Sequence, residues 1–398
     1  MNQLVAVAGL SLAVLAQAQQ NQQPPPAYLQ GRPPEMADSK QAPHPPKMTE
    51  TPPAEIPLDR IKVPPGFVVD LWAHGLPGGR AMARGAKGKI YVGTRSIGRV
   101  YEVTDRGDRR TVRIVAEKLT QPAGVAFADG SLYVAAIDKM LRYDGIEDKP
   151  DVQPVDLTAR FAFPPLQHHN WKYIAFGPDK KLYVPFGAPC NICEPPQEYA
   201  QIRRYNADGS GMEVIARGIR NSLGFDWHPQ THELWFTDNG RDWMGEEGPE
   251  DELNRVSKPG LDFGFLYCHA NGTPDAQVKR KDPCKGVTLP LALLGPHATA
   301  LGMLFYTGGM FPPAYRNLIF VARKGSWNRT RLFGYDVVTV KVDADGRNAQ
   351  VTPFMTGFLD AVGNKFWGRP AYVLQMPDGA LLVSDEQNGA IYRVRHRK

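Results

Sequence analysis

The chain has 398 residues, 42% of them hydrophobic and 22% charged, so it can build a sizeable core and is not disordered as a whole. Its 39 glycines and 36 prolines exclude an all-helical protein, because glycine weakens helix interiors and proline breaks them. The net charge of +6 is dispersed and accompanies no nucleic-acid-binding module, so we expect no nucleic acid partner. Instead, the basic balance favours an anionic cofactor, substrate or redox partner.

The first residues have the pattern of a secretory signal. An apolar run over residues 4–15 is followed by Ala16-Gln17-Ala18, a small-x-small cleavage pattern, although no Lys or Arg precedes the run. The run is too short to cross a bilayer core of about 30 Å, so no transmembrane span is expected in the mature chain. We predict a signal peptide over residues 1–18, a periplasmic or secreted protein, and a spacer rich in Pro and Gln over residues 19–63.

A strand–turn–strand unit recurs through residues 64–398, the predicted folded domain. Its copies share an apolar residue near the start of the second strand, namely Ile90, Leu132, Leu182, Leu234, Leu318 and Leu381. Six copies, each spaced to hold about four strands, predict an all-β fold, a six-bladed β-propeller. The strand that begins at Gly66 has no hairpin partner of its own. We therefore expect this N-terminal strand to complete the last blade and close the ring.

The four cysteines are an even number, as expected for an exported protein with disulfides. Cys190 and Cys193 form a C-x-x-C in GAPCNICE, and Cys268 and Cys284 lie further along the chain. We predict disulfides or a local loop staple. A zinc site built from all four cysteines is the alternative, although the second pair lacks zinc-knuckle spacing.

Propellers bind ligands at one end of the central channel, where loops of several blades converge, so polar residues in such loops are candidates. His168 and His169 precede the third repeat and offer a metal ligand or a general base. Arg220 and Asn221 precede the fourth repeat and offer a planar fork and a directed donor to carboxylates or carbonyls.

An acidic segment and two basic loops complete the candidates. Residues 237–254 are dense in oxygen ligands suited to calcium, without the spacing of an EF-hand, so a solvated acidic loop is the alternative. Lys324 lies near Trp327, Arg369 follows Trp367, and His297 opens the fifth repeat. Convergence of Arg220, Lys324 and Arg369 would create a pocket for a polyanionic ligand.

Together these segments resemble the soluble quinoprotein glucose/sorbosone dehydrogenase family, six-bladed propellers that bind pyrroloquinoline quinone (PQQ). The resemblance covers roughly residues 64–397. It rests on His169 before GPDKKLYV, and on IRNSLGFDWHP, TDNGRD…DELN, LGMLFYTG, GSWNR and GRPAYVLQMPDGALLVSD. GAPCNICE and GSWNR are similar to the sorbosone dehydrogenase branch.

This resemblance implies oxidation of an aldose or a sugar aldehyde such as sorbosone, with hydride passing to the quinone and electrons then to a cytochrome or quinone acceptor. His169 matches the general base, and Arg220 matches the residue that polarises the quinone carbonyl. Other residues match cofactor contacts: Asn221, His297, Lys324 and Arg369. Gly240 and Arg241 match the pair whose backbone carbonyls hold Ca2+.

Some positions depart from the family pattern. His168 stands where the family often has an acid, Arg241 where the glucose enzymes have Pro, and Ala371 where they have a second Arg; Gln121 is a candidate for their first-blade Gln. Two other functions compete. One is a calcium-dependent lactonase or esterase propeller, which needs Asp, Glu and Asn ligands from several blades. The other is a non-catalytic binding propeller of the cell envelope.

Overall fold

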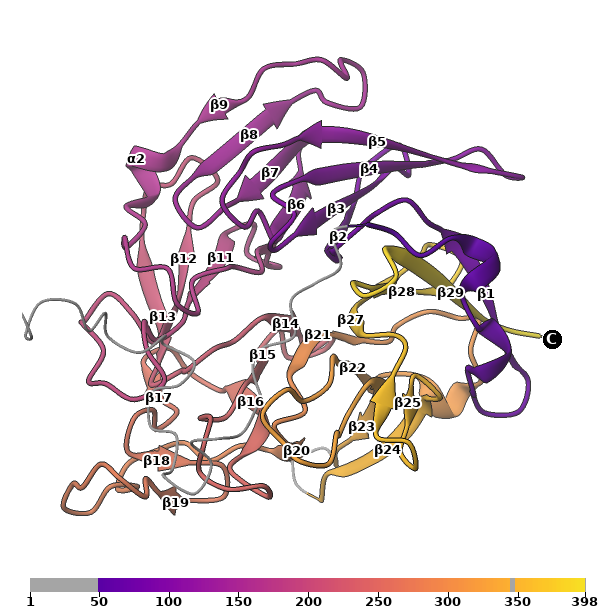
Figure 1. Ribbon diagram of the computed structural model, residues 1–398. Helices are drawn as coiled ribbons and strands as arrows, with labels where there is room; N and C mark the ends of the chain where they lie inside the picture. The colour runs from indigo at the N-terminus through magenta and orange to yellow at the C-terminus, as the bar shows by residue number, and fades with distance from the viewer. Residues whose placement is uncertain (1–48, 344–347, 398) are drawn as a thin grey trace, which may run out of the picture.

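The computed structural model describes residues 49–343 and 348–397, so the predicted signal peptide and most of the predicted spacer lie outside the described residues. In the described part, six sheets follow one another around a ring in chain order, which confirms the predicted six-bladed propeller (Figure 1). Within each blade, successive strands pair antiparallel.

The first three blades occupy the N-terminal half of the ring. Blade one contains β2 (Gly79–Arg84), β3 (Ile90–Thr94), β4 (Val100–Asp105) and β5 (Arg110–Ala116). Blade two contains β6 (Gly124–Ala128), β7 (Ser131–Ala135), β8 (Met140–Asp144) and β9 (Val155–Asp156), followed by the short helix α2 (Thr158–Phe161). Blade three contains β10 (Ala175–Phe176), β11 (Leu182–Phe186), β12 (Gln201–Tyr205) and β13 (Glu213–Arg217), and β17 (Leu261–Asp262) adds to it in parallel.

The last three blades complete the ring. Blade four contains β14 (Gly224–Trp227), β15 (Leu234–Asp238), β16 (Glu250–Val256) and β20 (Ala292–Pro296). Blade five contains β21 (Ala300–Phe305), β22 (Ile319–Arg323), β23 (Asp336–Lys341) and β24 (Gln350–Met355). Blade six contains β27 (Pro370–Gln375), β28 (Leu381–Asp385), β29 (Ala390–His396) and β1 (Phe67–Ala73). The 3-10 helix η5 (Pro313–Tyr315) lies between the first two strands of blade five, and the small hairpin of β18 (Cys268–His269) and β19 (Thr273–Pro274) lies between the last two strands of blade four. A second hairpin, β25 (Leu359–Asp360) with β26 (Lys365–Phe366), connects blades five and six.

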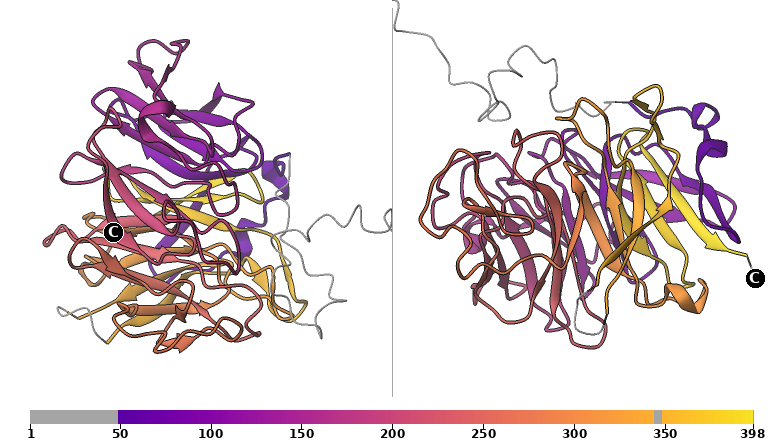
Figure 2. Two further views of the ribbon diagram at one scale, coloured as in Figure 1. Left: turned by 90° about the vertical axis from the view of Figure 1, so that its left-hand side faces the viewer. Right: turned by 90° about the horizontal axis from the view of Figure 1, so that it is seen from below.

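The N-terminal strand β1 closes the ring, as predicted. It pairs antiparallel with β29 from Phe67 opposite His396 to Ala73 opposite Ile391. Figures 1 and 2 show this indigo strand beside the yellow C-terminal strands. Pairing the two ends of the chain satisfies a blade edge that would otherwise expose unpaired backbone groups.

The residues before β1 also pack against the propeller. The Thr51 amide donates to the Asn388 carbonyl at 3.0 Å, and Lys62 forms a bridge with Thr356. Ile56, between the 3-10 helices η3 (Pro53–Glu55) and η4 (Leu58–Arg60), is buried. These residues are therefore folded, whereas their proline content predicts a spacer; a proline-rich stretch can dock where its few apolar side chains find a groove.

Neighbouring blades approach closely where their innermost strands meet. A Cβ on Gly224 of β14 would lie 2.0 Å from the Leu301 carbonyl oxygen, and one on Gly302 would lie 2.6 Å from the Tyr372 Cα. Only glycine permits this backbone contact. Buried aliphatic and aromatic side chains fill the space between the sheets, as in the cluster around Trp235, Ile319 and Val338.

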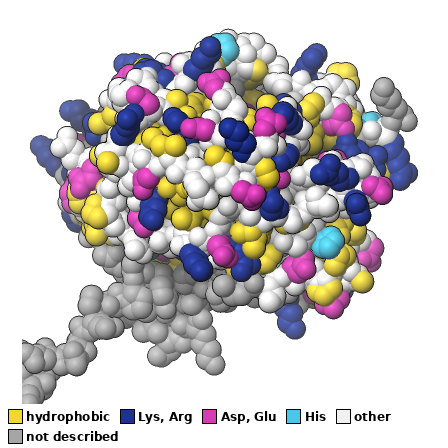
Figure 3. All heavy atoms as spheres, turned by 90° about the horizontal axis from the view of Figure 1, so that it is seen from above, with side chains coloured by type: hydrophobic (Ala, Val, Ile, Leu, Met, Phe, Trp, Pro, Cys, Tyr) yellow, Lys and Arg dark blue, Asp and Glu magenta, His cyan; other side chains and the backbone are white. Residues whose placement is uncertain are grey.

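The structure settles the state of the cysteines. Cys190 is bonded to Cys193 and Cys268 to Cys284, so the predicted disulfides are confirmed and the zinc alternative was wrong. No helix among the described residues combines the length and the apolarity that crossing a membrane requires. On the face shown in Figure 3, basic and acidic side chains are interspersed, so the excess positive charge is not concentrated there.

Candidate active site

Two kinds of position bring polar residues to the same end of the ring. Because the first two strands of a blade are antiparallel, the residue before the first strand lies beside the residue after the second, as the Glu386 amide shows by donating to the Arg369 carbonyl at 3.3 Å. The loops into the first strands carry His169, Arg220, His297 and Arg369. The positions directly after a second strand carry Arg95, Gly187, Asn239, Lys324 and Glu386.

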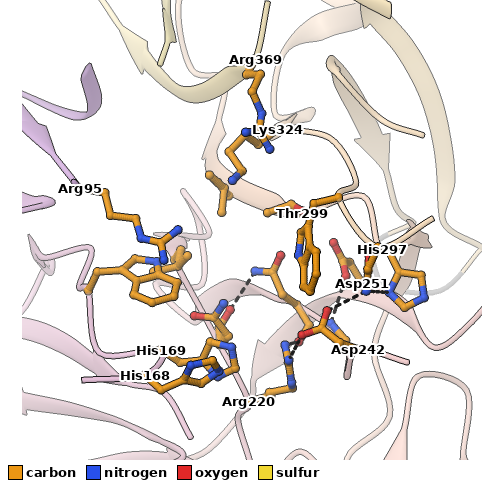
Figure 4. Close-up of a pocket in the computed structure, with 18 of the residues that line it drawn as sticks. Arg95, His168, His169, Arg220, Asp242, Asp251, His297, Thr299, Lys324 and Arg369 are labelled. Carbon is orange, nitrogen blue, oxygen red and sulfur yellow. Dashed lines mark hydrogen bonds and ion pairs between the residues drawn. The ribbon is translucent and has the colours of Figure 1, made fainter. Parts of the chain in front are cut away.

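A cavity of about 200 Å³ lies where these loops converge. Six of the predicted site residues line it together, namely His169, Arg220, Asn221, His297, Lys324 and Arg369, and so does Gly240. Figure 4 shows Arg95, Lys324 and Arg369 on one side of this cavity and His169 with Arg220 on the other. The cavity is also lined by residues that the sequence did not single out as a group: Arg80, Arg95, Trp171, Leu223, Thr299, Leu301 and Asn328.

His169 is held as a neutral imidazole with one free nitrogen. Its Nδ1 lies 3.0 Å from the Ala188 carbonyl oxygen, which can only accept, so Nδ1 carries the proton, and the unprotonated Nε2 has no hydrogen-bond partner among the described residues. Burial lowers the pKa of His169 well below its ordinary value, and the neighbouring His168 and Arg220 lower it further. The residue therefore has the protonation state that a general base needs at neutral pH.

Its neighbour His168 also faces the cavity. The two imidazole centroids lie 4.0 Å apart, and burial lowers the pKa of His168 to about 4. The His168 Nε2 is buried and has no hydrogen-bond partner among the described residues. His168 stands at the position where the resemblance predicts an acid, and it makes no hydrogen bond to His169. The orientation of His169 is set by the Ala188 carbonyl.

The Arg220 guanidinium is fixed from three directions. Its Nη2 donates to Asp242 Oδ2 at 2.7 Å and to Asn191 Oδ1 at 2.9 Å, and its Nη1 donates to the Asn239 carbonyl at 3.2 Å. The backbone of this loop is fixed as well, because the amides of Arg220 and Asn221 donate to the Asp238 carboxylate at 2.9 and 2.6 Å. A guanidinium held this way presents its charge at a defined place in the cavity.

Three cationic side chains share one buried carboxylate on the opposite side. Glu386 contacts Arg80, lies 3.5 Å from Lys324 Nζ and 3.7 Å from Arg369 Nη1. Burial alone would raise the pKa of Glu386, but these three cations bring it below its ordinary value. Burial and the charge of Arg369 lower the pKa of Lys324 well below its ordinary value. The excess of positive charge indicates a site for an anion.

His297 does not offer a free nitrogen. Its Nε2 donates to the Gly245 carbonyl at 2.9 Å, and its Nδ1 accepts from Asn328 Nδ2 at 3.1 Å. The same Asn328 amide donates to Asp242 Oδ1 at 2.8 Å. His297 therefore contributes a wall of the cavity and helps to anchor the loop that carries Asp242.

The two predicted calcium-binding residues point in different directions. Gly240 lines the cavity, whereas the side chain of Arg241 is buried against the loop closed by Cys268–Cys284. Arg241 donates to Asp275 Oδ2 at 2.5 Å and to Gln277 Oε1 at 2.8 Å. The backbone of Arg241 is thus anchored, and its departure from Pro is explained by this buried ion pair.

The acidic segment over residues 237–254 serves mainly as local structure. Besides Asp238, Asp251 accepts from the amides of Gly240 and Ala300, and Glu252 accepts from the Ala270 amide. Within the described ranges, no group of three or more His, Cys, Asp or Glu side chains is arranged to hold a metal ion. Asp238, Asp251 and Glu252 are buried and bonded to backbone amides, so the segment is not the solvated acidic loop that was the alternative, and the predicted calcium site on the backbone carbonyls of Gly240 and Arg241 stays a prediction.

Several buried polar atoms of the lining residues have no partner in the described part of the chain. They are Asn221 Oδ1, Asn239 Oδ1, Asn328 Oδ1, Arg220 Nε and Arg369 Nε. Buried polar groups are normally hydrogen-bonded, so orphaned donors and acceptors around one cavity indicate a polar ligand. An anionic ligand that carries both hydrogen-bond donors and acceptors fits these atoms and the positive charge.

The fold and the cavity define a class of protein: a six-bladed propeller with a cationic cavity at an end of its ring. The sequence model of the glucose/sorbosone dehydrogenase family matches residues 162–393, which is more than half of the chain. An uncharacterised protein of Borreliella burgdorferi is 33% identical over 351 residues, which cover 85% of this chain and 91% of the relative. The chain belongs to the glucose/sorbosone dehydrogenase family, and the resemblance predicted from the motifs is confirmed.

Solved structures share the fold. The PQQ domain of pyranose dehydrogenase from Coprinopsis cinerea, in its holo form, has a TM-score of 0.68 at 19% identity and covers 84% of this chain and 97% of its own. The PQQ-bound aldose sugar dehydrogenase of Streptomyces coelicolor has a TM-score of 0.60 at 19% identity and covers 84% and 99%. The calcium structure of a family AA12 enzyme from Trichoderma reesei has a TM-score of 0.70 at 17% identity and covers 84% and 97%. Family membership supports a dehydrogenase-type oxidation of a sugar as the activity.

Proposed function

We propose that this protein is a PQQ-dependent dehydrogenase that oxidises an aldose or a sugar aldehyde such as sorbosone, with His169 as the general base. One observation carries the proposal. The neutral imidazole of His169 and a fixed Arg220 share a cavity with four further cationic side chains: Arg80, Arg95, Lys324 and Arg369. A base, a carbonyl-polarising cation and an anion-binding wall are the groups that this reaction requires.

The residues present fit the cofactor. Lys324 and Arg369 would bind its carboxylates, and Arg220 and Asn221 would bind its quinone oxygens. When bound, PQQ supplies the two-electron acceptor for the hydride removed from the substrate. The backbone carbonyls of Gly240 and Arg241 are the proposed ligands of Ca2+, a hard cation that takes oxygen ligands.

The side chains of this protein perform the proton transfer and the positioning. His169 Nε2 takes the proton of the substrate hydroxyl while Nδ1 stays hydrogen-bonded to Ala188, which fixes the direction of the ring. Trp171 stacks under the Arg95 guanidinium at 3.8 Å, and Trp327 lines the same cavity. These aromatic faces suit a planar cofactor or the apolar face of a sugar ring.

The compartment and the partners belong to the same proposal. Two disulfides are typical of an oxidising compartment, which supports export to the periplasm or the medium under the signal peptide predicted over residues 1–18. The substrate is then a sugar or sugar aldehyde outside the cytoplasm, and the electrons pass to a cytochrome or quinone acceptor.

Titration of the purified, cofactor-free protein with PQQ and Ca2+, followed by absorbance, tests the proposal. We expect saturable binding at micromolar PQQ, followed by oxidation of sugars with an artificial electron acceptor. Absence of binding at these concentrations would refute it. Lactone hydrolysis without PQQ would indicate the hydrolase alternative. A protein that shows no turnover, and whose ligand affinity is the same in wild type and in His169→Ala, would be a binding protein.

A further inference from the structure

The GAPCNIC segment, residues 187–193, lies between the two proposed catalytic side chains. The Ala188 carbonyl accepts from His169 Nδ1 at 3.0 Å, and the Ala188 amide donates to the Arg220 carbonyl at 2.8 Å. A Cβ on Gly187 would lie 2.4 Å from the His169 carbonyl oxygen and 2.9 Å from that of Arg220. A glycine is therefore required where this segment passes between both residues.

Asn191, in the same segment, holds the guanidinium of Arg220. Its side chain is fully buried, and its Oδ1 accepts from Arg220 Nη2 at 2.9 Å and from the Asp242 amide at 2.9 Å. Its Nδ2 donates to the Asp242 carbonyl at 3.1 Å. Asp242 Oδ2 accepts from the same Arg220 nitrogen, so one amide joins the loop before β14 to the loop after β15.

The disulfide encloses this amide. Cys190 and Cys193 are bonded across Asn191 and Ile192, in a stretch between β11 and β12 that contains no strand. A loop without a strand ladder has few backbone hydrogen bonds to hold its shape, and a covalent bond that closes it removes alternative conformations.

We propose that Asn191 is a positioning residue for Arg220 and that the Cys190–Cys193 bond holds Asn191 in place. The C-x-x-C motif thus acts on the reaction through the geometry of Arg220 and carries no electrons itself. The kinetic part of this inference rests on the proposed function, whereas the structural part concerns the cofactor-free protein. Loss of Asn191 should remove one of the three contacts of the guanidinium and loosen the Asp242 loop that provides another, while His169 keeps its hydrogen bond to the Ala188 carbonyl.

Hydrogen exchange in the cofactor-free protein tests the structural part. The Asp242 amide donates to Asn191 Oδ1, so Asn191→Ala should accelerate its exchange by at least about tenfold, the effect of losing a hydrogen bond worth about 1.4 kcal/mol. Asn206→Ala is the matched control, because its side chain contacts Ser210 in an exposed turn. Unchanged exchange at Asp242 in Asn191→Ala would overturn the proposal.

Kinetics of the reconstituted enzyme test the consequence. Asn191→Ala should lower kcat roughly 10- to 100-fold, as expected for a displaced charged group, without moving the acid limb of the pH profile that His169 sets. Asn191→Asp keeps an oxygen for Arg220 and should lose less. Cys190→Ser with Cys193→Ser should resemble Asn191→Ala, and the combined variant should lose no more than either alone.

The outcomes separate this inference from the proposed function. The positioning role would be refuted if a folded Asn191→Ala variant kept the kcat of the wild type. It would also be refuted if the kcat losses of Asn191→Ala and of the disulfide variant simply added up in the combined variant. If the disulfide variant does not fold, the two Asn191 variants still decide. A wild-type protein that neither binds PQQ nor oxidises a sugar would refute the proposed function, while the exchange rate at Asp242 would still decide whether Asn191 holds this loop.

Discussion

Glu386→Gln tests whether one buried carboxylate keeps the cationic wall of the cavity stable. Glu386 is 3% exposed, contacts Arg80, and lies 3.5 Å from Lys324 Nζ and 3.7 Å from Arg369 Nη1. At an effective dielectric constant near 20, a pair 3.5 Å apart attracts by about 5 kcal/mol before desolvation is subtracted. Removing one partner of a buried pair costs roughly 3–5 kcal/mol, because the other charge stays buried.

We expect the lower end of that range, about 3 kcal/mol, because Gln keeps one acceptor oxygen and Lys324 can release its proton. The melting temperature of the cofactor-free protein should fall by about 4 °C at pH 7, because the unfolding entropy is about 2.1 cal/mol/K per residue. Since the folded-state pKa of Glu386 lies below its ordinary value of 4.5, its contribution is complete above that pH and is lost as the pH falls. The difference between variant and wild type should therefore shrink below about pH 4.

Thermal unfolding followed by circular dichroism measures this effect. The matched control is Glu213→Gln, which removes an exposed carboxylate that also contacts two cations, Lys181 and Arg204. The control should change the melting temperature little, because exposed ion pairs contribute about 0–1 kcal/mol. Equal melting temperatures for Glu386→Gln and wild type at pH 7 would show that the cations do not depend on this carboxylate.

Three further predictions concern the cavity and the ring. Lys324→Ala should weaken PQQ binding at least about tenfold in an absorbance titration, yet should lower the melting temperature of the cofactor-free protein less than Glu386→Gln does, because Arg80 and Arg369 still contact Glu386 and burial already disfavours the charge of Lys324. Because the pKa of His169 lies well below 6.5, kcat/KM should stay level as the pH falls through 6.5; a half-maximal point at 6.5 would mean an ordinary, exposed imidazole. Gly224→Ala should destabilise the protein by about 1–3 kcal/mol, because its Cβ would contact the Leu301 carbonyl. The control Gly309→Ala, whose Cβ meets open space, should be tolerated. Equal denaturation midpoints for the two variants would contradict the close packing of the blades.

The ring was predictable because each blade repeats the same local pattern. Alternating strands and turns with Gly, Asp or Pro mark the hairpins directly in the sequence, and the unpaired strand at Phe67 requires a partner elsewhere. The loops before the first strands were predictable for the same reason, since a repeat fixes where Arg220 and Arg369 enter the cavity.

Residues after the second strands were harder to find. Arg95 and Glu386 follow β3 and β28 directly, but alone they read as ordinary strand-end charges. Superposing the repeats gives a signal, because the TDN that ends with Asn239 and the SDE that ends with Glu386 occupy equivalent places. Arg80 lies within β2, a first strand, so comparison of the positions after the second strands does not identify it.

Long-range partners were not predictable from composition. Arg241 contacts Asp275 across an insertion, and the carboxylates of Asp238 and Asp251 accept from backbone amides, whereas their number in the segment suggests metal ligands. A count of carboxylates cannot distinguish these uses, because hydrogen bonds to nearby amides depend on the path of the folded backbone. The same limit applies to Asn191, whose partners lie in two other loops.

The rate of cofactor reduction in a single turnover tests the central claim most directly. Wild type and His169→Ala would each be loaded with PQQ and Ca2+, mixed anaerobically with a sugar or sugar aldehyde, and followed by the absorbance of the cofactor. We predict equal cofactor binding and a reduction rate about 10²- to 10⁴-fold lower in the variant, the range expected for loss of a general base. Equal reduction rates in both proteins would contradict the assignment of His169 as the base.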